Sequence, residues 1–341
     1  MIKTAIVGYG FSAKTFHIPF LLAQPNFHWT HMVTGHPEAV AADFSAVQCI
    51  SAVEHLDAEE IDLVVITTPN YLHFAQAKYC LEKGMHVVLE KPMVVNSLQA
   101  LDLIDISKKT GKQVFVFQNR RWDGDFLTLR SILNENQIGQ VKRFTSRFDR
   151  FRPDVRERWR EQPGDGAGML WDLGPHLIDQ AVALFGPPRS VTARVAILRN
   201  NALVDDHFDV WLDYDDIQVT LGSTSYQAGP IPRFVLEGTE GTFIKYGLDV
   251  QEEDLKHGMD LNDASWGQEP ESSGGILYQP QQNRVVATAP GNYAGFWHQV
   301  ELSIEQGLSP PVSLEEAYTV IRIIELAHQS AQSGKRLAFD E

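Results

Sequence analysis

Cysteines and positive charges are scarce in this sequence, and long apolar runs are missing from it. Cys49 and Cys80 are the only cysteines among 341 residues, too few for a disulfide framework and not spaced as metal ligands. The net charge of −15 disfavours nucleic acid or an anionic membrane as a partner. No run approaches the ~18 apolar residues of a membrane span, and no signal peptide precedes the first apolar stretch. We therefore expect a cytoplasmic protein in a reducing compartment.

The first 120 residues alternate between strand-like and helix-like stretches, which is the pattern of a doubly wound parallel sheet. Strands are expected at 4–7, 29–33, 63–67, 86–89 and 113–117, with helices at 12–23, 74–82 and 97–110. Several of the strands are almost wholly apolar, as expected where helices cover both faces of a sheet. The sequence therefore predicts an α/β domain over residues 1–120.

Residues 121–341 have a different texture and predict an α+β domain. Two-residue alternation marks strands at 141–148, 191–198, 208–214, 217–221, 234–238 and 242–246, which indicate an open, mostly antiparallel sheet. A short helix is expected at 127–133, and residues 250–292 are expected to form a polar excursion over the surface. A strongly periodic helix at about 314–331 is expected to pack back on the first domain. The open sheet also predicts a homodimer or homotetramer, because an exposed apolar face would be a liability.

A glycine turn follows the first strand and opens the first helix. The motif is Gly8-x-Gly10-x-x-Ala13, in which the glycines let the backbone approach a pyrophosphate and Ala13 allows close packing of helix on strand. The backbone N–H groups of Phe11 and Ser12 would then donate to that pyrophosphate. A purely structural turn is the alternative. The strand–turn–helix context favours a dinucleotide site, and with it a Rossmann domain.

The end of the second strand bears on which dinucleotide binds. NAD sites usually place Asp or Glu here to bind the ribose hydroxyls, whereas this strand ends in Thr34-Gly35-His36. The missing carboxylate removes repulsion of a 2′-phosphate, and Thr34 and His36 are able to bind one. We therefore favour NADP, with NAD as the alternative, since no arginine is present to select the phosphate.

A polar loop, Thr67-Thr68-Pro69-Asn70-Tyr71-Leu72-His73, follows the strand at 63–67. One interpretation is a plain connection in which Asn70 caps the next helix. The other places Thr68, Pro69, Asn70 and His73 beside the nicotinamide ribose of the cofactor. Ligands bind at the carboxyl ends of the strands in such sheets, which favours the second interpretation.

The strand at 86–89 runs into Glu90-Lys91-Pro92. A lysine at such a place is ordinarily a surface charge, but Pro92 constrains the backbone and redirects the chain. In the functional interpretation, Lys91 supplies the cation that hydride transfer at an alcohol requires. Glu90 would then accept a hydrogen bond from a ribose hydroxyl of the cofactor.

Asp172, His176 and Asp179 lie four and three residues apart, near one side of a predicted helix start. Three interpretations remain open at this point. His176 and Asp179 could bind a metal, although no third ligand has suitable spacing. Alternatively, these residues cap and stabilise the helix. In the third, His176 is an acid–base group oriented by a carboxylate. We favour the third and expect no metal, because Lys91 and His176 together would complete a dehydrogenase site.

At these residues the chain resembles the glucose–fructose oxidoreductase and inositol dehydrogenase family (Gfo/Idh/MocA). The resemblance rests on the glycine turn, the T-P-N-x-x-H loop, E-K-P and D-x-G-x-H-x-x-D, and it covers nearly the whole chain. It implies a Rossmann domain followed by an open antiparallel sheet, and oxidation or reduction of a hydroxyl of a sugar or polyol. It also implies that Lys91 is the catalytic lysine, joined to Pro92 by a cis peptide. Asp172 and His176 become the acid–base pair, and Asp179 becomes a substrate contact.

An arginine-rich stretch at 147–160 resembles one subgroup of this family, which includes NADP-dependent scyllo-inositol dehydrogenases. Surface ion pairs with Asp149, Asp154 and Glu157 are the simpler explanation of these arginines. The alternative is a loop at the mouth of the pocket, where Trp159 and Arg160 contact polyol hydroxyls or an acidic sugar.

The sequence thus predicts an NADP-preferring dehydrogenase that transfers a hydride between the nicotinamide and a hydroxyl or ketone of a cyclic polyol or sugar, such as scyllo-inositol. A cofactor-binding sensor on the same fold is the alternative from another class. It is disfavoured because a sensor needs no proton relay. Among enzymes, a dihydrodiol dehydrogenase or another sugar oxidoreductase is the alternative.

Overall fold

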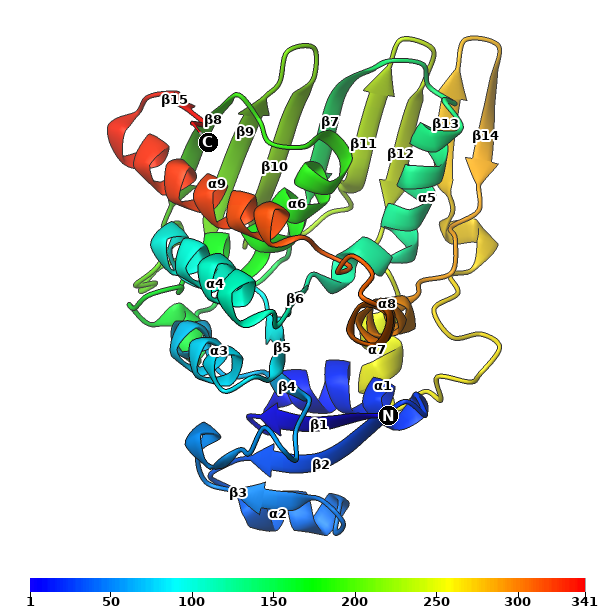
Figure 1. Ribbon diagram of the computed structural model, residues 1–341. Coiled ribbons are helices and arrows are strands. Elements are labelled where there is room, and N and C mark those ends of the chain that lie inside the picture. The colour runs from blue at the N-terminus through cyan, green and yellow to red at the C-terminus, as the bar shows by residue number, and fades with distance from the viewer. Residues whose placement is uncertain (341) are drawn as a thin grey trace. The chain divides into compact units, whose positions relative to one another are not determined.

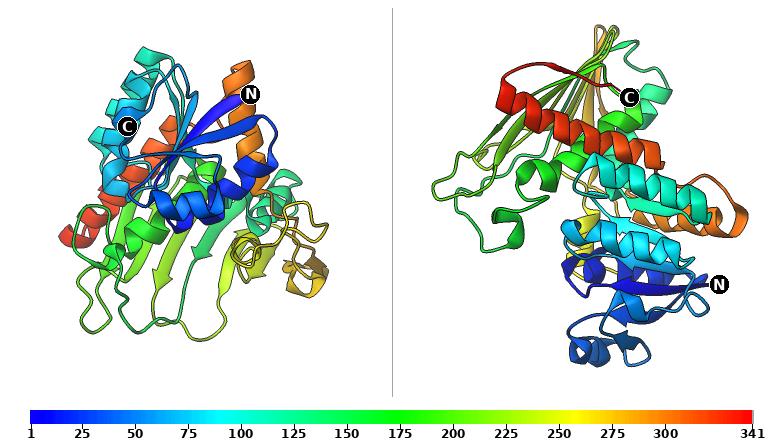
Figure 2. Two further views of the ribbon diagram at one scale, coloured as in Figure 1. Left: turned by 90° about the horizontal axis from the view of Figure 1, so that it is seen from below. Right: turned by 60° about the vertical axis from the view of Figure 1, so that its left-hand side comes forward.

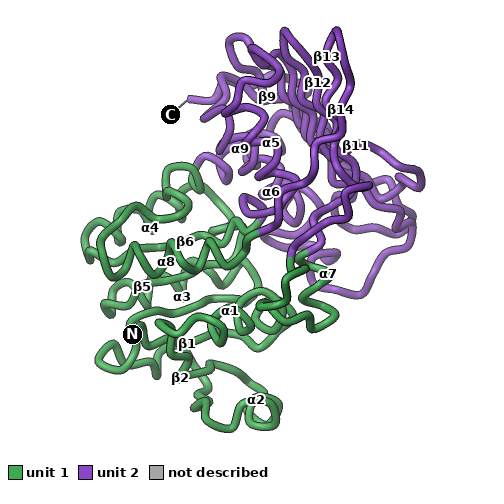
Figure 3. Tube along the Cα trace, turned by 90° about the vertical axis from the view of Figure 1, so that its right-hand side faces the viewer, with its two compact units in different colours: residues 1–119, 251–266, 292–318 green, residues 120–250, 267–291, 319–341 purple. Residues whose placement is uncertain are grey.

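Strands and helices alternate through the first 119 residues and form the core of one of two units (Figures 1 and 3). The computed structural model describes residues 1–340. Unit 1 comprises residues 1–119, 251–266 and 292–318, and unit 2 comprises residues 120–250, 267–291 and those from 319 onward. The chain therefore passes from unit 1 to unit 2 and returns twice.

A six-stranded parallel sheet in the order β3-β2-β1-β4-β5-β6 forms the centre of unit 1. Its strands are β1 (Ile2–Val7), β2 (Phe27–Val33), β3 (Gln48–Ile50), β4 (Leu63–Ile66), β5 (His86–Glu90) and β6 (Val114–Phe117). β4 and β6 are buried along their whole length, as their apolar sequences require. The glycine turn follows β1 and Lys91 follows β5, so both lie at the carboxyl edge of the sheet, where ligands bind in such folds.

The helices of unit 1 start and stop at local signals. They are α1 (Ile18–Ala23), α2 (Pro37–Asp43), α3 (His73–Glu82), α4 (Ser97–Thr110), α7 (Gln251–Lys256) and α8 (Tyr293–Gln306). The Asn96 side chain caps α4 by accepting from the Gln99 N–H at 2.9 Å, and Gly111 ends α4 with a φ of +69°. A π-helical turn, Ala13–His17, precedes α1.

Unit 2 is built on a nine-stranded sheet in the order β14-β13-β12-β11-β7-β10-β9-β8-β15. The strands are β7 (Val141–Arg147), β8 (Ser190–Ala196), β9 (His207–Asp213), β10 (Gln218–Thr224), β11 (Pro232–Gly238), β12 (Thr242–Tyr246), β13 (Gly275–Gln279), β14 (Gln282–Val286) and β15 (Leu337–Ala338). Neighbouring strands are antiparallel except β7 and β10, which are parallel.

Three helices lie on one face of this sheet (Figures 1 and 2). They are α5 (Gly124–Asn134), α6 (Met169–Phe185) and the unit 2 part of α9 (Leu314–Ser333). Phe185 of α6 packs on Phe144 of β7, with ring centroids 5.7 Å apart. Among residues 1–340, every helix is too short or too polar to cross a membrane.

The predicted fold class is confirmed, and the differences are local. Residues 250–292 are more than a surface excursion: they contain α7 and the β13–β14 hairpin, which extends the sheet of unit 2. β14 is exposed along nearly its whole length and is held by its pairing with β13, so it leaves no apolar periodicity in the sequence. β3, α2 and α8 were also not predicted. β3 and α2, with three and seven residues, are too short to set up a clear period.

Candidate active site

The glycine turn after β1 combines a strained glycine with an open one. Gly8 has a φ of +95°, and a Cβ atom there would lie 3.0 Å from the Thr67 Oγ1 atom. The Thr67 hydroxyl donates toward the carbonyl oxygens of Val7 and Gly8, each 3.0 Å away, and so fixes the turn. A Cβ atom at Gly10 would meet nothing within 4 Å. Gly8 is therefore required for the conformation of the turn, whereas the absence of a side chain at Gly10 leaves space that a ligand is able to occupy.

That space suits a dinucleotide. The first N–H groups of a helix have no partners within the helix, and here they belong to the segment of Phe11, Ser12 and Ala13 directly after Gly10. A phosphate anion next to them would gain both their hydrogen bonds and the positive end of the helix dipole. The bare Gly10 backbone allows the close approach that such contacts need.

Side chains from the end of β2, from α2 and from the glycine turn lie where the adenosine side of a dinucleotide is expected. Thr34 is half-buried, its hydroxyl accepts from the His36 N–H at 3.0 Å, and the His36 ring is exposed. The Tyr9 hydroxyl of the glycine turn donates to Asp43 at 2.6 Å, and loss of solvent together with this hydrogen bond raises the pKa of Tyr9 to about 12. The Lys14 ammonium lies 4.1 Å from the centroid of the Tyr9 ring. Asp43 thus brings a carboxylate from α2 to the turn, which sequence reasoning missed because α2 itself was not predicted.

His73 joins the loop after β4 to the loop after β5. Its ring is buried, with Nδ1 3.0 Å from the Pro92 carbonyl oxygen and Nε2 2.9 Å from the Thr68 carbonyl oxygen. Burial lowers the pKa of His73, whereas the two carbonyl groups and the charge of Glu90 act in the opposite direction. The Thr68 hydroxyl donates to Gln76 at 2.6 Å, and Asn70 is buried. The structure therefore places His73 between two backbone segments at the sheet edge.

Glu90 connects the glycine-turn helix to Lys91. Its carboxylate accepts from the Ser12 hydroxyl, lies 2.9 Å from His17 Nε2 and accepts from the Lys91 N–H at 3.1 Å. Burial by itself would raise the pKa of Glu90, but the hydrogen bond and charge of His17, the Ser12 hydroxyl and the charge of Lys91 lower it to about 2. The peptide bond between Lys91 and Pro92 is cis, as the resemblance implied.

The π-helical turn explains how Ser12 and His17 reach the same carboxylate. In an α-helix, residues five apart point about 140° away from each other. In a π-helix, where the hydrogen bonds join residues five apart, such residues lie near the same side, and here the Ile18 N–H bonds to the Ala13 carbonyl oxygen in that register. His17 is buried beside Phe117, with ring centroids 4.4 Å apart. His17 was missed from sequence because an α-helical period points it away from Ser12.

In unit 2, α6 carries the acid–base candidates. Asp172 and His176, one turn apart, lie on the same side of the helix, and His176 is buried. The Arg160 Nε atom lies 3.4 Å from Asp172, and the Arg158 Nη2 atom lies 3.9 Å from it. Asp179 is buried and accepts two hydrogen bonds from Arg121, at 2.8 and 2.7 Å. Its two oxygens thus hold Arg121 in place.

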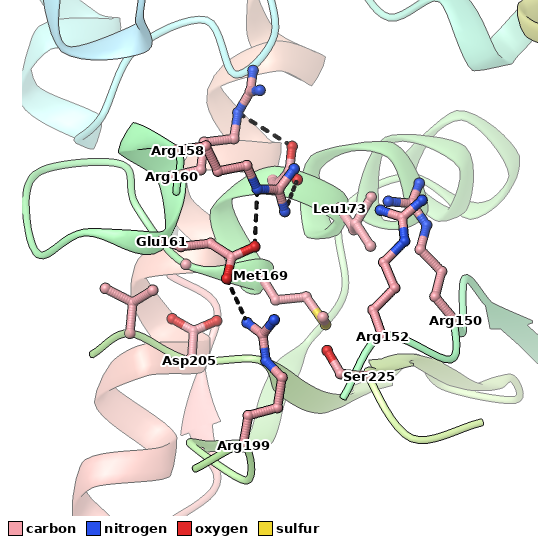
Figure 4. Close-up of a pocket in the computed structure, with 13 residues that line it drawn as sticks. Arg150, Arg152, Arg158, Arg160, Glu161, Met169, Leu173, Arg199, Asp205 and Ser225 are labelled. Carbon is pink, nitrogen blue, oxygen red and sulfur yellow. Dashed lines mark hydrogen bonds and ion pairs between the residues drawn. The ribbon is translucent and has the colours of Figure 1, made fainter. Parts of the chain in front are cut away.

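A cavity of about 30 Å³ lies beside Asp172 and has arginines in its walls (Figure 4). We call it the arginine pocket; its lining includes Arg150, Arg152, Arg158, Arg160, Arg199, Glu161, Asp172, Asp205 and Ser225. Trp159 carries the Arg160 guanidinium over its ring, at 4.8 Å from the centroid. Of the ion pairs expected for this stretch, Arg147 with Asp149 is present, whereas Arg158 pairs with Glu161. Within residues 1–340, no three His, Cys, Asp or Glu side chains gather as a metal site would need.

Models of one family match both parts of the chain. The model described as "Oxidoreductase family, NAD-binding Rossmann fold" matches residues 2–118, and "Oxidoreductase family, C-terminal alpha/beta domain" matches residues 130–339. The chain belongs to the Gfo/Idh/MocA family. The resemblance inferred from the motifs is therefore confirmed, and the protein is an oxidoreductase whose N-terminal domain is of the NAD-binding Rossmann type.

Relatives and solved structures span the whole chain. "Uncharacterized oxidoreductase YdgJ" of Escherichia coli (strain K12) is 41% identical over 336 residues, which are 97% of this chain and 96% of YdgJ. "scyllo-inositol 2-dehydrogenase (NADP(+)) IolW" of Bacillus subtilis (strain 168) is 36% identical over 344 residues, 99% of this chain and 96% of IolW. The solved structure of oxidoreductase yvaA from Bacillus subtilis has a TM-score of 0.96 at 34% identity and covers 100% of this chain and 99% of its own.

Proposed function

We propose that this Gfo/Idh/MocA oxidoreductase is an NADP-preferring dehydrogenase of a cyclic polyol or sugar, with scyllo-inositol as the model substrate. The observation that carries the proposal is Lys91 at the carboxyl end of β5, its own N–H bound to the carboxylate that also holds the glycine-turn helix. A cation fixed at this edge suits alcohol oxidation, because it stabilises the charge that develops on the substrate oxygen. Similarity to the NADP-dependent IolW supports this substrate class.

The side chains then take the following roles. The nicotinamide cofactor, when bound, accepts or supplies the hydride. In the oxidation direction, His176 takes the proton of the substrate hydroxyl while the Lys91 ammonium stabilises the developing alkoxide. Asp172, one helical turn before His176, orients the imidazole. In the reduction direction His176 returns the proton.

The cofactor roles of the unit 1 residues follow from the same proposal. The glycine turn from Gly8 to Ala13 holds the pyrophosphate, and Thr34 binds the 2′-phosphate that makes NADP the preferred cofactor. Thr68, Pro69 and Asn70 line the nicotinamide ribose, and His73 and Glu90 keep this loop and Lys91 in position. Asp179 and Trp159 belong to the substrate side, together with Arg160. Assembly as a homodimer or homotetramer and a cytoplasmic location remain predictions.

Turnover by the full chain tests the proposal. We expect NADP⁺ to be reduced in the presence of scyllo-inositol, myo-inositol or a free aldose, and NADPH to be oxidised by the corresponding ketone, both followed by absorbance of the reduced nicotinamide. NADP should support a higher kcat/KM than NAD. Binding of NADPH without turnover of any polyol, sugar or ketone would contradict the proposal and favour a sensor.

Gly10→Ala tests the cofactor site without disturbing the fold. The new methyl group meets no atom of the folded chain within 4 Å, so the unfolding free energy should stay within about 0.5 kcal/mol of wild type. The same methyl group fills the space needed by the pyrophosphate, so the Kd for NADPH should rise about tenfold or more. Unchanged NADPH affinity would place the cofactor elsewhere.

A further inference from the structure

The start of α6 is held by a residue from another segment of unit 2. Asp205 lies in the connection between β8 and β9, 35 residues after Leu170. Its carboxylate accepts from the Leu170 N–H at 2.7 Å, and its backbone carbonyl oxygen accepts from the Met169 N–H at 2.8 Å. The first N–H groups of a helix have no partners within the helix. Asp205 therefore caps α6 from outside.

Gly168, the residue directly before α6, makes room for this cap. It has a φ of +92°, and a Cβ atom there would overlap the carboxylate group of Asp205. A residue with a side chain would thus strain the backbone and displace the carboxylate. At many helix starts the residue at this position supplies the capping oxygen from its own side chain. In this helix Asp205 supplies that oxygen instead.

The capped start of α6 fixes the backbone of Asp172. The Asp172 N–H bonds to the Gly168 carbonyl oxygen at 3.0 Å, which closes the first turn of the helix. The Gly168 N–H in turn bonds to the Arg160 carbonyl oxygen at 2.9 Å, and the Arg160 Nε atom lies 3.4 Å from the Asp172 carboxylate. A shift of Gly168 would therefore move both the backbone of Asp172 and the guanidinium group beside its carboxylate.

The loop that carries Asp205 is itself fixed by the next residue. Asp206 is buried and accepts from the Leu198 N–H at 2.7 Å and from the Arg199 N–H at 2.9 Å. The Arg199 guanidinium lies 2.8 Å from Asp206 and 3.1 Å from Glu161, and all three side chains are buried. Buried charges that compensate one another hold their geometry, because loss of one partner would leave the other unpaired. Asp205 is thus presented to α6 by a closed loop.

Pro175 makes the first turn of α6 depend more on this support. Pro175 lies inside the helix and has no N–H, so the hydrogen bond from residue 175 to the Trp171 carbonyl oxygen is missing. The missing bond falls in the turn between Asp172 and His176. The turn that carries Asp172 is therefore joined to the rest of the helix by one hydrogen bond fewer, and Asp205 holds it from outside.

We infer that Asp205 is a positioning residue of the reaction: by capping α6, it holds Asp172 where the Asp172 carboxylate orients the His176 imidazole. This inference rests on the proposed function and adds a residue that acts through Asp172. Asp205 itself takes no part in the proton or hydride transfer. It supplies a hydrogen-bond acceptor to the helix start, which an asparagine side chain supplies as well and an alanine side chain does not.

Kinetics of variants of the full chain test the inference, with the polyol or sugar of the panel above that wild type oxidises fastest. Asp205→Ala should lower kcat about ten- to a hundredfold, because misplacing a reacting geometry by about 1 Å costs about 10²-fold. KM for this substrate and Kd for NADPH should stay within about threefold of wild type. Asp205→Asn should keep kcat within about threefold. Asp216→Ala, which removes an exposed carboxylate after β9, is the matched control and should change none of these values.

An Asp172→Asn background shows whether Asp205 acts through Asp172. The orienting carboxylate is already absent there, so Asp205→Ala should lower kcat less than about threefold further. The inference is wrong if Asp205→Ala keeps the wild-type kcat, if Asp205→Asn loses as much as Asp205→Ala, or if the loss is equal in both backgrounds. In each of these cases the dehydrogenase assignment stands.

Hydrogen exchange of the backbone amides separates the inference from the proposed function. If wild type turns over no compound, the proposed function fails. In that case, faster exchange at residues 169–173 in Asp205→Ala but not in Asp205→Asn still supports the hold of Asp205 on the turn of Asp172, and equal exchange in all three proteins overturns it. Urea unfolding checks that each variant is folded. If Asp205→Ala does not fold, Asp205→Ser takes its place, because the serine oxygen ends one bond short of the carboxylate oxygens.

Discussion

Glu90 in unit 1 and Asp205 in unit 2 are both carboxylates largely enclosed by the protein, and their pKa values move in opposite directions. Loss of solvent raises the pKa of Asp205 to about 6, the charge of Asp206 adds to the rise, and hydrogen bonds from backbone N–H groups oppose it without cancelling it. Loss of solvent acts on Glu90 as well, but His17, Ser12 and Lys91 together lower its pKa to about 2. The partners decide the charge of an enclosed carboxylate more than its burial does.

The two carboxylates hold their segments in different ways, because their pKa values lie on opposite sides of the ordinary value. The Glu90 segment, which positions Lys91, is held by an anion that stays charged at every physiological pH. Asp205 holds the start of α6, accepting from the Leu170 N–H at 2.7 Å, with a carboxylate that titrates close to neutrality. Asp205 lines the arginine pocket, so the net charge of this pocket changes as Asp205 ionises, whereas Glu90 keeps its charge over the same pH range.

The largest effect is expected from removing the two side chains proposed to act on the substrate, Lys91 in unit 1 and His176 in unit 2. Lys91→Ala and His176→Ala should each lower kcat/KM for the polyol about 10²–10⁴-fold, because the alkoxide loses its cation or the hydroxyl loses its base. NADPH affinity, measured by fluorescence titration, should stay close to wild type. Lys109→Ala, at an exposed position on α4, is the matched control. Normal turnover, or loss of NADPH binding, would contradict the proposed roles.

Replacing Glu90 tests whether its ionised carboxylate stabilises the fold. Because its pKa in the folded protein lies below the ordinary value of 4.5, the Glu90 charge stabilises the fold above pH 4.5, and this stabilisation is lost as the pH falls toward about 2. Glu90→Gln should lower the free energy of unfolding by about 2–3 kcal/mol at pH 7, measured in urea.

The difference in the free energy of unfolding between wild type and Glu90→Gln should become smaller as the pH falls from about 4.5 to about 2. Glu59→Gln, which changes an exposed side chain, should leave stability unchanged. A constant gap at all pH values would show that the charge of Glu90 is not what stabilises the segment.

Asp205→Asn should have a smaller effect with the opposite sign. The pKa of Asp205 in the fold lies above the ordinary value of 3.8, so ionising it opposes folding, and this penalty grows as the pH rises from 3.8 to about 6. Asparagine keeps an oxygen that accepts from the Leu170 N–H and carries no charge. The free energy of unfolding should rise by about 1 kcal/mol at pH 7 and by less at pH 4. If Asp205→Asn destabilises the protein as much as Glu90→Gln, the contrast between the two carboxylates is wrong.

Some residues of the candidate site were predictable from the sequence and others were not. Gly8, Gly10 and Lys91 were found because their signals are local: a turn between strand and helix, and a lysine before a proline at a strand end. His17 was missed because a π-helical turn changes the period on which helix interpretation relies. Asp205 was missed because it reaches α6 from a loop 35 residues after Leu170, a separation that no sequence pattern encodes.

The sequence by itself determined the fold class, the family and the residue types on which the proposed hydride transfer depends, since strand periodicity and short motifs are properties of neighbouring residues. Only the tertiary structure decided how those residues are held. It brought Ser12 and His17 to Glu90, Asp43 to Tyr9, and Arg150 and Arg152 to one wall of a pocket beside Asp172. These contacts join segments far apart in the chain, and their charges and pKa values depend on burial and partners that exist only after folding.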